Sequence, residues 1–539
     1  MRLWGPPWAK GVVVAMRRRQ FLVASAAGAG GLALGSLTAC APPPGPDAPD
    51  GPFDCGVASG VHSEDAVVLW TRFAPAASSA VELTWSVASD PSFSTVVAYG
   101  AVTASPDGDG TAKVLAQGLA PGATYWYRFG VDGLTSPVGR TRTLPDPSST
   151  PERVRLAVGS CQQFAAGFYP AWRAIAAADV DAVLHLGDYI YESTGNNPLA
   201  VRTDTVGTAT DLAGYRAKYR LVRSDRDLQA AHAAHPFAPI WDDHEVVNNM
   251  NRTIAQTDPQ RQRDGYQAWF EYQPVWPIDG SRIHRRARFG RLVDVSLLDG
   301  RQFRDPQPTD QWGNDLVVAS TATAPGSVVH SPDRSLLGGA QFDWLTQGLS
   351  AAQDDGVTWK LLGNPVMMHP VRLLDLDEPW LRQLEPATPR HAGLYLFFDM
   401  WDGYQDERQR LLQHLHDERV GNVAIATGDI HSFWQGGLRV DMDDASSPVV
   451  AQEYVCGSIS SRAADYFGDL AKNISDLLKA SQPPLNHVDF SHRGYGIMEY
   501  TAAGSRVEFH RVDASARGSR PWAGPAFQVD AASGVLVNV

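Results

Sequence analysis

The chain has 539 residues, with 46 Lys or Arg against 59 Asp or Glu, so its formal net charge is −13. This length predicts two or more domains with ample cores. The acidic balance excludes a general nucleic-acid binder, which needs a basic surface, and four cysteines are too few for a disulfide-stabilised scaffold.

Residues 1–40 have the features of an export signal. Two arginines at 18–19 precede an apolar, Gly- and Ala-rich segment that ends in Leu-Thr-Ala-Cys at 37–40. This is the pattern of a twin-arginine signal with a lipoprotein-type cleavage site, and an N-terminal anchor helix is the alternative. We expect an exported protein that is either secreted or lipidated at Cys40 on the cell surface, with the lipid as its only membrane contact. Residues 41–52, rich in Pro, Gly and Asp, predict a flexible tether.

Residues 53–146 predict an all-β domain. Short runs of β-branched and aromatic residues are separated by Pro- and Gly-rich turns, and the turn before the aromatic run at 124–130 is typical of fibronectin-type sandwiches. Candidate ligands do not cluster here. We therefore expect a fibronectin/Ig-like β-sandwich that serves packing and placement rather than chemistry.

From residue 152 to residue 539 the pattern is that of an α/β domain. A strand at 153–160, a helix at 169–178 and a strand at 181–186 predict a βαβ unit. Open α/β sheets hold their sites at the carboxyl ends of the strands, where Cys161 lies. Its thiolate would bind a metal ion, although a buried apolar cysteine is the alternative.

The stretch at 182–192 carries two candidate ligands directly after a buried apolar strand. Asp188 follows Gly187 and offers a hard carboxylate that can bridge two cations. Tyr191 offers a phenolate, which suits a strong Lewis acid such as a ferric ion. The alternative is a capping aspartate and a core tyrosine.

The run Trp-Asp-Asp-His-Glu at 241–245 also follows a short apolar strand. Carboxylates buried this close together need cations or protons between them. We expect Asp243 to bind a second metal ion and His244 to reach the substrate or its leaving-group oxygen. Asn248 and Asn249 would add neutral oxygen ligands or hold the loop.

Two further strands, at 292–298 and 360–364, end in polar side chains. Arg301 would bind phosphate oxygens through its planar guanidinium, or form an ion pair with Asp299. Asn364 and His369 give a weaker signal of the same kind.

The strand at 423–427 is followed by Asp429 and His431, which alternate across one residue. In a loop that leaves the strand, both side chains can turn toward one pair of metal ions. A neutral imidazole is a common ligand of iron or zinc. The repetition of such strand ends within one domain favours a shared metal site.

Together these stretches resemble the motifs of the calcineurin-like metallophosphoesterases. Three of them depart from that pattern and are similar instead to the PhoD-like alkaline phosphatase family: Ser-Cys-Gln at 160–162, Trp-Asp-Asp-His-Glu at 241–245 and Thr-Gly-Asp-Ile-His at 427–431. The resemblance runs from about residue 53 to residue 500. It implies a metallophosphoesterase-like layered α/β (α+β) sandwich beside the N-terminal β domain.

The resemblance also implies the metals. Carried over position by position, it gives a ferric ion (Fe3+) these four ligands: Cys161, Asp188, Tyr191 and His431. It gives one or two calcium ions (Ca2+) the carboxylates of Asp188, Asp243 and Asp429 with Asn248 or Asn249. Hard oxygen donors suit calcium, whereas thiolate and phenolate suit ferric iron.

The expected function is that of an exported alkaline phosphatase D-like phosphohydrolase, acting as a monomer on phosphate mono- and/or diesters through a metal-activated hydroxide. His244 and Arg301 are its catalytic candidates. The alternatives are a phospholipase D-type phosphodiesterase that acts on lipid headgroups and a non-catalytic surface lipoprotein that binds metal or phosphate. Cys55 and Cys456 would form a disulfide or remain two separate buried thiols.

Overall fold

The computed structural model of the chain describes residues 51–193, 200–308, 318–319, 331–375, 383, 393–395, 398–442, 444, 446–462, 469–481 and 485–538. The predicted export signal, Cys40 and most of the tether lie outside these residues. Among the helices that are described, none combines the length and the apolar character that crossing a bilayer requires.

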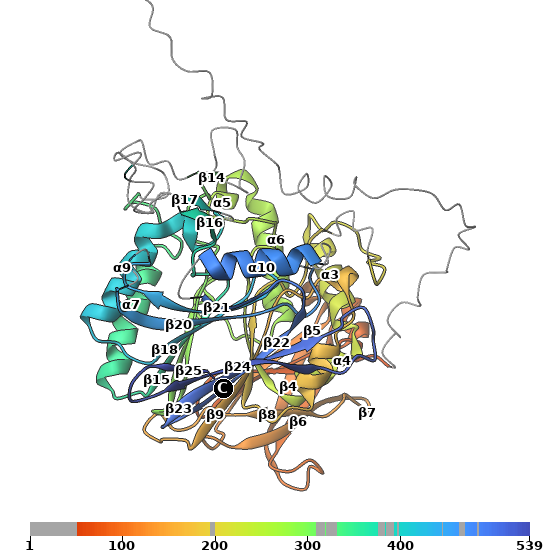
Figure 1. The fold of residues 1–539 in the computed structure, drawn as a ribbon. Helices are drawn as coiled ribbons and strands as arrows, with labels where there is room; N and C mark the ends of the chain where they lie inside the picture. The colour runs from red at the N-terminus through yellow and green to blue at the C-terminus, as the bar shows by residue number, and fades with distance from the viewer. Residues whose placement is uncertain are drawn as a thin grey trace, which may run out of the picture.

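Two stacked β-sheets form the centre of the molecule (Figure 1). The larger contains ten described strands, in the spatial order β25 (Leu536–Asn538), β24 (Trp522–Asp530), β23 (Gly504–Val512), β22 (Arg493–Thr501), β9 (Arg153–Gly159), β10 (Ala182–Leu186), β11 (Pro236–Ile240), β1 (Val57–Gly60), β2 (Ala66–Arg72) and β5 (Thr111–Gln117). Strands β9, β10 and β11 are parallel. β10 and β11 are buried at every residue, which is why they are short apolar runs without alternation.

The smaller central sheet has the order β12 (Arg285–Phe289), β13 (Val293–Leu297), β15 (Trp359–Asn364), β18 (Val423–Thr427), β20 (Val449–Cys456), β19 (Phe433–Arg439) and β21 (Leu485–Asp489). Its strands β13, β15, β18 and β20 are parallel. A third sheet contains β14 (Val318–Ala319), β17 (Gly393–Tyr395) and β16 (Arg372–Asp375).

Helices cover the outer faces of both central sheets, as expected for a layered α/β fold. Those packed on the larger sheet are α2 (Pro170–Ala176), α3 (Leu212–Arg223), α4 (Arg226–Ala234) and α6 (Pro259–Tyr272). Those packed on the smaller sheet are α7 (Gly339–Asp354) and α9 (Gln405–Asp417), at the left of Figure 1. The short α5 (Ile254–Thr257) precedes α6, and α10 (Asp469–Ser481) lies beside β21. The predicted arrangement of mixed sheets with helices is confirmed.

The N-terminal region has two sheets that pack on a shared core, and one of them continues into the rest of the molecule. One of its sheets is local and contains β4 (Val96–Ala104), β3 (Val81–Ala88), β6 (Thr124–Val131), β7 (Leu134–Thr135) and β8 (Gly139–Arg142). Its other strands, β1, β2 and β5, continue the larger central sheet, because β1 pairs with β11 in parallel register, Ser59 opposite Pro236. The N-terminal region is therefore built into the sheet that carries part of the candidate site.

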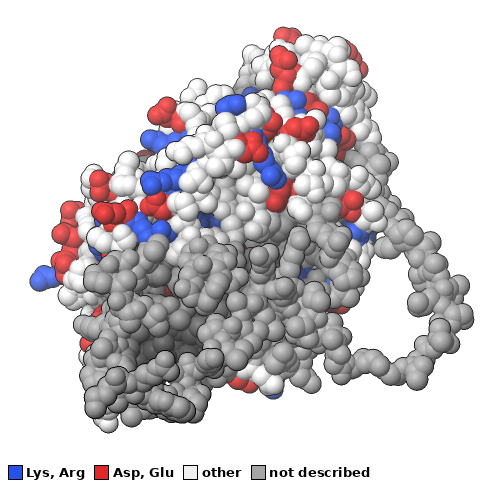
Figure 2. Space-filling model, turned by 90° about the horizontal axis from the view of Figure 1, so that it is seen from above, with Lys and Arg blue, Asp and Glu red and all other residues white. Residues whose placement is uncertain are grey.

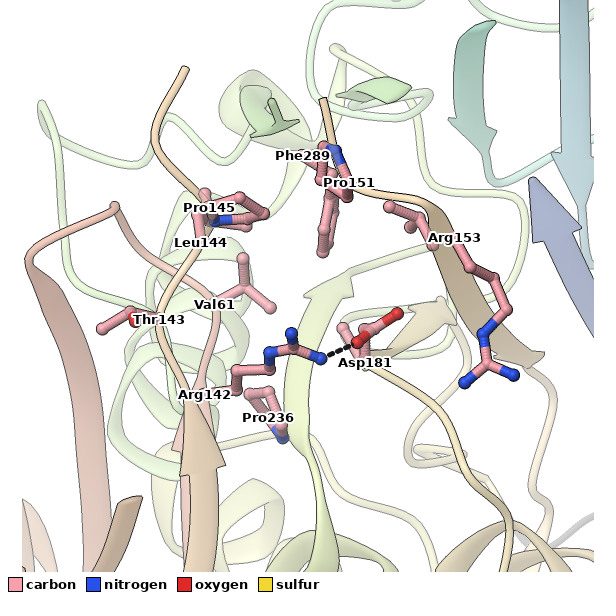
Figure 3. A pocket seen from close by; sticks show the side chains of 12 residues that line it. Val61, Arg142, Thr143, Leu144, Pro145, Pro151, Arg153, Asp181, Pro236 and Phe289 are labelled. Carbon is pink, nitrogen blue, oxygen red and sulfur yellow. Dashed lines mark hydrogen bonds and ion pairs between the residues drawn. The ribbon is translucent and has the colours of Figure 1, made fainter. Parts of the chain in front are cut away.

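The surface charges are mixed on the face seen in Figure 2, two buried cysteines are unpaired, and one small crevice lies beside the larger sheet. Seen from above, Lys and Arg are interspersed with Asp and Glu on the described part of the face (Figure 2). Cys55 and Cys456 are separate buried thiols, so the disulfide alternative is wrong. A small crevice lies at the amino ends of β9, β10 and β11, where Arg142 pairs with Asp181 (Figure 3).

Candidate metal centre

The carboxyl ends of the parallel strands from both central sheets meet at one edge of the molecule. Close approach at this edge depends on Gly428, where an added Cβ would lie 2.7 Å from the Ser160 Oγ at the end of β9. The loops that follow β9, β10 and β11 therefore face the loops that follow β13 and β18. All of the predicted metal ligands belong to these loops.

The first group of ligands gathers around the carboxylate of Asp188. Ligand atoms of Cys161, Asp188 and His431 lie within 4.8 Å of one another. The Tyr191 hydroxyl donates to Asp188 Oδ2 at 2.8 Å and lies 3.0 Å from His431 Nε2. The structure thus brings together the four side chains that the sequence assigned to one metal ion.

Neighbouring groups orient two of these ligands. His431 Nδ1 is 3.0 Å from the carbonyl oxygen of Arg462, so Nδ1 carries the proton and Nε2 presents its lone pair to Asp188 and Tyr191. The Ser461 hydroxyl donates to Tyr191 Oη at 2.7 Å. Ser461 had no signal in the sequence.

A second group of ligands shares Asp188 with the first. Ligand atoms of Asp188, Asp243 and His244 lie within 4.8 Å of one another. Asp243 Oδ1 is buried and has no hydrogen-bond partner among the described residues. A carboxylate oxygen left in this state is costly unless a cation binds it.

The structure favours Asn249 over Asn248 as the amide of this group. Asn249 is half-buried, and its backbone N–H donates to Asp243 Oδ2 at 2.5 Å. Asn248 is exposed, and its backbone N–H instead donates to Glu192 at 3.1 Å. The choice of Asn248 stays a prediction, and the backbone contact with Asp243 supports Asn249 as the alternative.

Arg301 lies beside the ligand groups and is held by Asp242. Its side chain has no exposed surface, and it donates through Nε and Nη2 to the two carboxylate oxygens of Asp242, at 2.5 and 2.8 Å. Nor does its guanidinium pair with Asp299, which accepts the Arg301 backbone N–H at 3.1 Å. Asp242 thus fixes the guanidinium in a buried position, whereas Nη1 has no hydrogen-bond partner among the described residues, and the phosphate-binding role of Arg301 stays a prediction.

Asn364 and His369 lie outside both ligand groups. Asn364 Nδ2 donates to the Val366 carbonyl at 2.5 Å, and the His369 backbone N–H donates to Glu453 at 2.6 Å. These contacts hold the loop after β15.

Two glutamates support the ligand loops and were not assigned roles from the sequence. Glu245 accepts backbone N–H groups of Asp188, Tyr189 and Asp242 at 3.2, 2.7 and 2.9 Å, which ties the loop after β10 to the loop after β11. Glu192 lies 2.7 Å from His244 Nδ1 through Oε2. The Asp-Asp-His-Glu run was a signal for Glu245, since four such residues in a buried loop need internal partners.

Backbone strain is concentrated at this edge. Five residues of the ligand loops have left-handed backbone conformations, with φ between 56° and 61°: Cys161, Asp188, Asn249, Asp429 and His431. This region is uncommon for residues other than glycine and often marks functional sites. Gly187 has φ 99°, and an added Cβ would lie 2.5 Å from Asp242 Cβ.

The electrostatics indicate that cations belong here. Burial raises the pKa of Asp188 well above its usual value; His244 opposes this, and the charge of Asp243 adds to it. Burial and then the charge of Asp188 also raise the pKa of Cys161, and burial raises that of Asp429. Ionised carboxylates and a thiolate this close need positive charge between them. The donors fit a thiolate- and phenolate-binding metal ion beside a harder cation.

Comparisons with known proteins agree with this geometry. A family model described as PhoD-like phosphatase matches residues 156–509, and one described as the N-terminal domain of PhoD-like phosphatase matches residues 39–145. Alkaline phosphatase D of Bacillus subtilis (strain 168) is 34% identical over 470 residues, which cover 82% of this chain and 75% of that protein.

Two solved structures are also similar to this chain. A structure of PhoD is 31% identical with a TM-score of 0.79, covering 90% of this chain and 92% of its own. A purple acid phosphatase from yellow lupin (Lupinus luteus) seeds covers 90% of this chain and 72% of its own with a TM-score of 0.51 and 9% identity, which is a likeness of fold alone.

Proposed function

Because the chain belongs to the PhoD-like phosphatase family and is a phosphoric ester hydrolase of the alkaline phosphatase D kind, we propose that its ligand loops hold a ferric ion beside calcium to cleave phosphate mono- and/or diesters. The observation that carries this proposal is the sharing of Asp188 by two ligand groups. A shared carboxylate is what two adjacent cations need as a bridge. The family membership, rather than this geometry, argues against a non-catalytic binding protein.

The two positions differ in chemistry. Ferric iron would be held by the following side chains: Cys161, Asp188, Tyr191 and His431. Calcium would be held by Asp188 and Asp243, which share one ligand group, together with Asp429 and the amide of Asn249, which the family resemblance adds. Sulfur and phenol donors are found only in the first group and carboxylates dominate the second, in line with the preferences of the two ions.

When bound, the cations would neutralise the phosphoryl oxygens and lower the pKa of a water molecule to about 7, far below that of bulk water. His244 is the residue placed to move a proton. With Nδ1 held by Glu192, Nε2 is the nitrogen that would serve the ester's leaving oxygen. With no cation bound, burial lowers the His244 pKa, but the charges of Asp243, Asp188 and Glu192 outweigh this and raise it well above the usual value; of these three, Glu192 is the one that would not bind metal. The ring packs on Tyr191, with 4.2 Å between ring centroids, and its side chain remains 18% exposed.

Elemental analysis tests the metal assignment. We expect iron and calcium in the purified full-length protein, together with hydrolysis of nitrophenyl phosphate. Comparing this ester with bis(nitrophenyl) phosphate and phosphatidylcholine separates monoesterase, diesterase and lipid headgroup activity. Protein that hydrolyses esters at full rate without iron would refute the ferric site.

The leaving group tests the role of His244. His244→Gln should slow hydrolysis of alkyl phosphates by about 10²-fold or more, because the leaving alkoxide must be protonated. It should slow hydrolysis of nitrophenyl phosphate much less, because nitrophenolate leaves without a proton. Iron and calcium contents should not change. Glu192→Gln is the matched variant and should show the same dependence more weakly, since it disturbs only the orientation of the ring. Equal losses for both esters would refute the proton-donor role.

We also propose export by the twin-arginine route with lipidation at Cys40, on the strength of residues 18–40. The double variant Arg18→Lys/Arg19→Lys should be retained inside the cell, and Cys40→Ala should be released from the membrane fraction. An unchanged distribution of both variants would contradict the proposal.

A further inference from the structure

The pair Asp242–Arg301 lies beside the ligand groups without belonging to either. Asp242 follows β11 of the larger sheet, and Arg301 lies in the loop after β13 of the smaller sheet. The contact therefore joins the two sheets. The two side chains are 1% and 0% exposed, and the guanidinium binds both oxygens of the carboxylate.

The guanidinium faces more negative charge than Asp242 supplies. Arg301 Nη1 lies 3.8 Å from Asp243 Oδ2 and 4.0 Å from Asp399 Oδ2, and Nη2 lies 3.7 Å from Asp429 Oδ1. These distances are too long for hydrogen bonds. At such separations in a buried site, the attraction between opposite charges is still large.

A structural ion pair alone does not explain this arrangement. One aspartate is sufficient to neutralise a buried arginine, and a pair of this kind generally adds little net stability. Here the Arg301 guanidinium also lies within 4.0 Å of three carboxylates besides that of Asp242. Two of them, Asp243 and Asp429, are the ones assigned to calcium above. Without a positive charge between them, they would repel one another whenever the metal is absent.

We propose that Arg301 is a built-in counter-ion, oriented by Asp242, that keeps Asp243 and Asp429 together before calcium binds and limits how tightly calcium is then held. The inference rests on the calcium assignment of the proposed function. It makes Arg301 a positioning residue, since its guanidinium would act through the carboxylates of Asp243 and Asp429. The fixed positive charge attracts the carboxylates and so stabilises the metal-free protein. It also repels the incoming calcium ion and so weakens calcium binding.

The test uses the full-length protein after treatment with a chelator, with calcium alone as the probe. Thermal unfolding with and without calcium and calorimetric titration with calcium are measured for wild type, Arg301→Met, Arg301→Lys, Asp242→Asn and the double variant Asp242→Asn/Arg301→Met. In Arg301→Met the midpoint of the metal-free protein should fall by about 5 °C or more, and that of the calcium-bound protein by less than half as much. Its calcium Kd should fall by about fivefold or more.

The other variants fix the sign of the effect. Asp242→Asn removes the negative charge that partly neutralises Arg301, so the guanidinium should repel calcium more strongly and the calcium Kd should rise. Arg301→Lys keeps the charge and should stay near wild type, and the double variant should lie between the two single variants. Arg408→Met is the matched control: it breaks another buried pair, with Asp402 at 2.7 Å, and should lower both midpoints equally.

Two results would overturn the inference. One is an equal fall of both midpoints in Arg301→Met with unchanged or weaker calcium binding, which is the result of a purely structural pair. The other is a wild-type chain that binds no calcium. Should Arg301→Met fail to fold, Asp242→Asn decides, because a calcium Kd that does not rise in that variant also refutes the counter-ion. Since no ester is used, a failure here is distinct from a failure to find phosphatase activity.

Discussion

The two ends of the parallel strands are built in opposite ways. At the carboxyl ends, buried carboxylates, a thiolate and a phenol crowd together on loops with left-handed backbone conformations. At the amino ends, charges are paired and partly exposed: Arg142, which pairs with Asp181, has a side chain that is 38% exposed (Figure 3). The same strands support both edges, so the difference lies in the loops.

This contrast indicates where the fold trades stability for function. Strained backbone and mutually repelling buried groups each cost free energy, and they persist only where surrounding structure or a bound cation compensates. The amino-end edge contains ordinary interactions that stabilise the sheet ends. Changes at the two edges should therefore differ in kind: loss of metal and turnover at one, small shifts of stability at the other.

The largest effect is expected at the carboxylate that both ligand groups share. Asp188→Ala removes the bridge, so iron and calcium should be lost together and turnover should fall on the order of 10³-fold or more. Elemental analysis beside an assay with nitrophenyl phosphate measures both. The metal-free stability should not fall, because one member of a repelling group has gone. Retention of either metal at wild-type content would contradict the bridging position.

The next effect concerns a residue that touches no substrate. Glu245→Gln keeps the size of the side chain but replaces one accepting oxygen by an NH₂ group that faces backbone N–H groups. The loops after β10 and β11 should then lose their common anchor, with a roughly 10–100-fold loss of metal affinity or turnover, the usual range for groups that orient ligands. A chelator titration with turnover as the readout measures it. Glu407→Gln is the matched control, because Glu407 is a buried glutamate that accepts the backbone N–H groups of Leu336 and Leu337, outside the ligand loops, and this variant should leave metal affinity unchanged.

Sequence patterns located most of the residues at the carboxyl-end edge but not the contacts among them. Apolar runs that end in polar residues identified the strand ends. Strands buried on both faces are apolar throughout, so the first polar residue marks where each strand ends. They did not reveal the parallel pairing of β1 with β11 or the binding of Arg301 to Asp242, because in both cases the partner is far away in the sequence. Asn248 and Asn249 are identical in type, and only the fold of the loop separates them.

A buried lysine at the amino-end edge gives a pH-dependent test of the comparison. Lys360, near the start of β15, donates to Gln353 Oε1 at 2.5 Å and the Gly421 carbonyl at 3.1 Å. Burial lowers its pKa from 10.5 to about 8, and Asp294 offsets this only in part. Between these values the unfolded chain binds the proton and the folded chain does not, so stability rises with pH.

The measurement is the free energy of unfolding of wild type and Lys360→Met across this range. Below pH 8 the lysine should cost the wild type about 3 kcal/mol relative to the variant, apart from the change in packing. The difference should shrink as the pH rises from about 8 to about 10.5, while turnover of the variant stays near wild type. A difference that does not vary with pH would mean that the lysine is charged in the folded protein.

The smallest effect is expected at the crevice of Figure 3. Arg142→Ala removes a partly exposed ion pair, and such pairs contribute less than about 1 kcal/mol. Asp181 is not left without a partner, because it also accepts the backbone N–H of Arg155 at 2.8 Å. Denaturant unfolding should therefore show a shift below about 1 kcal/mol, and iron content, calcium content and turnover should match wild type. A large loss of turnover in this variant would show that the two edges are coupled through the strands, and the division of the molecule into a strained functional edge and a tolerant structural edge would then fail.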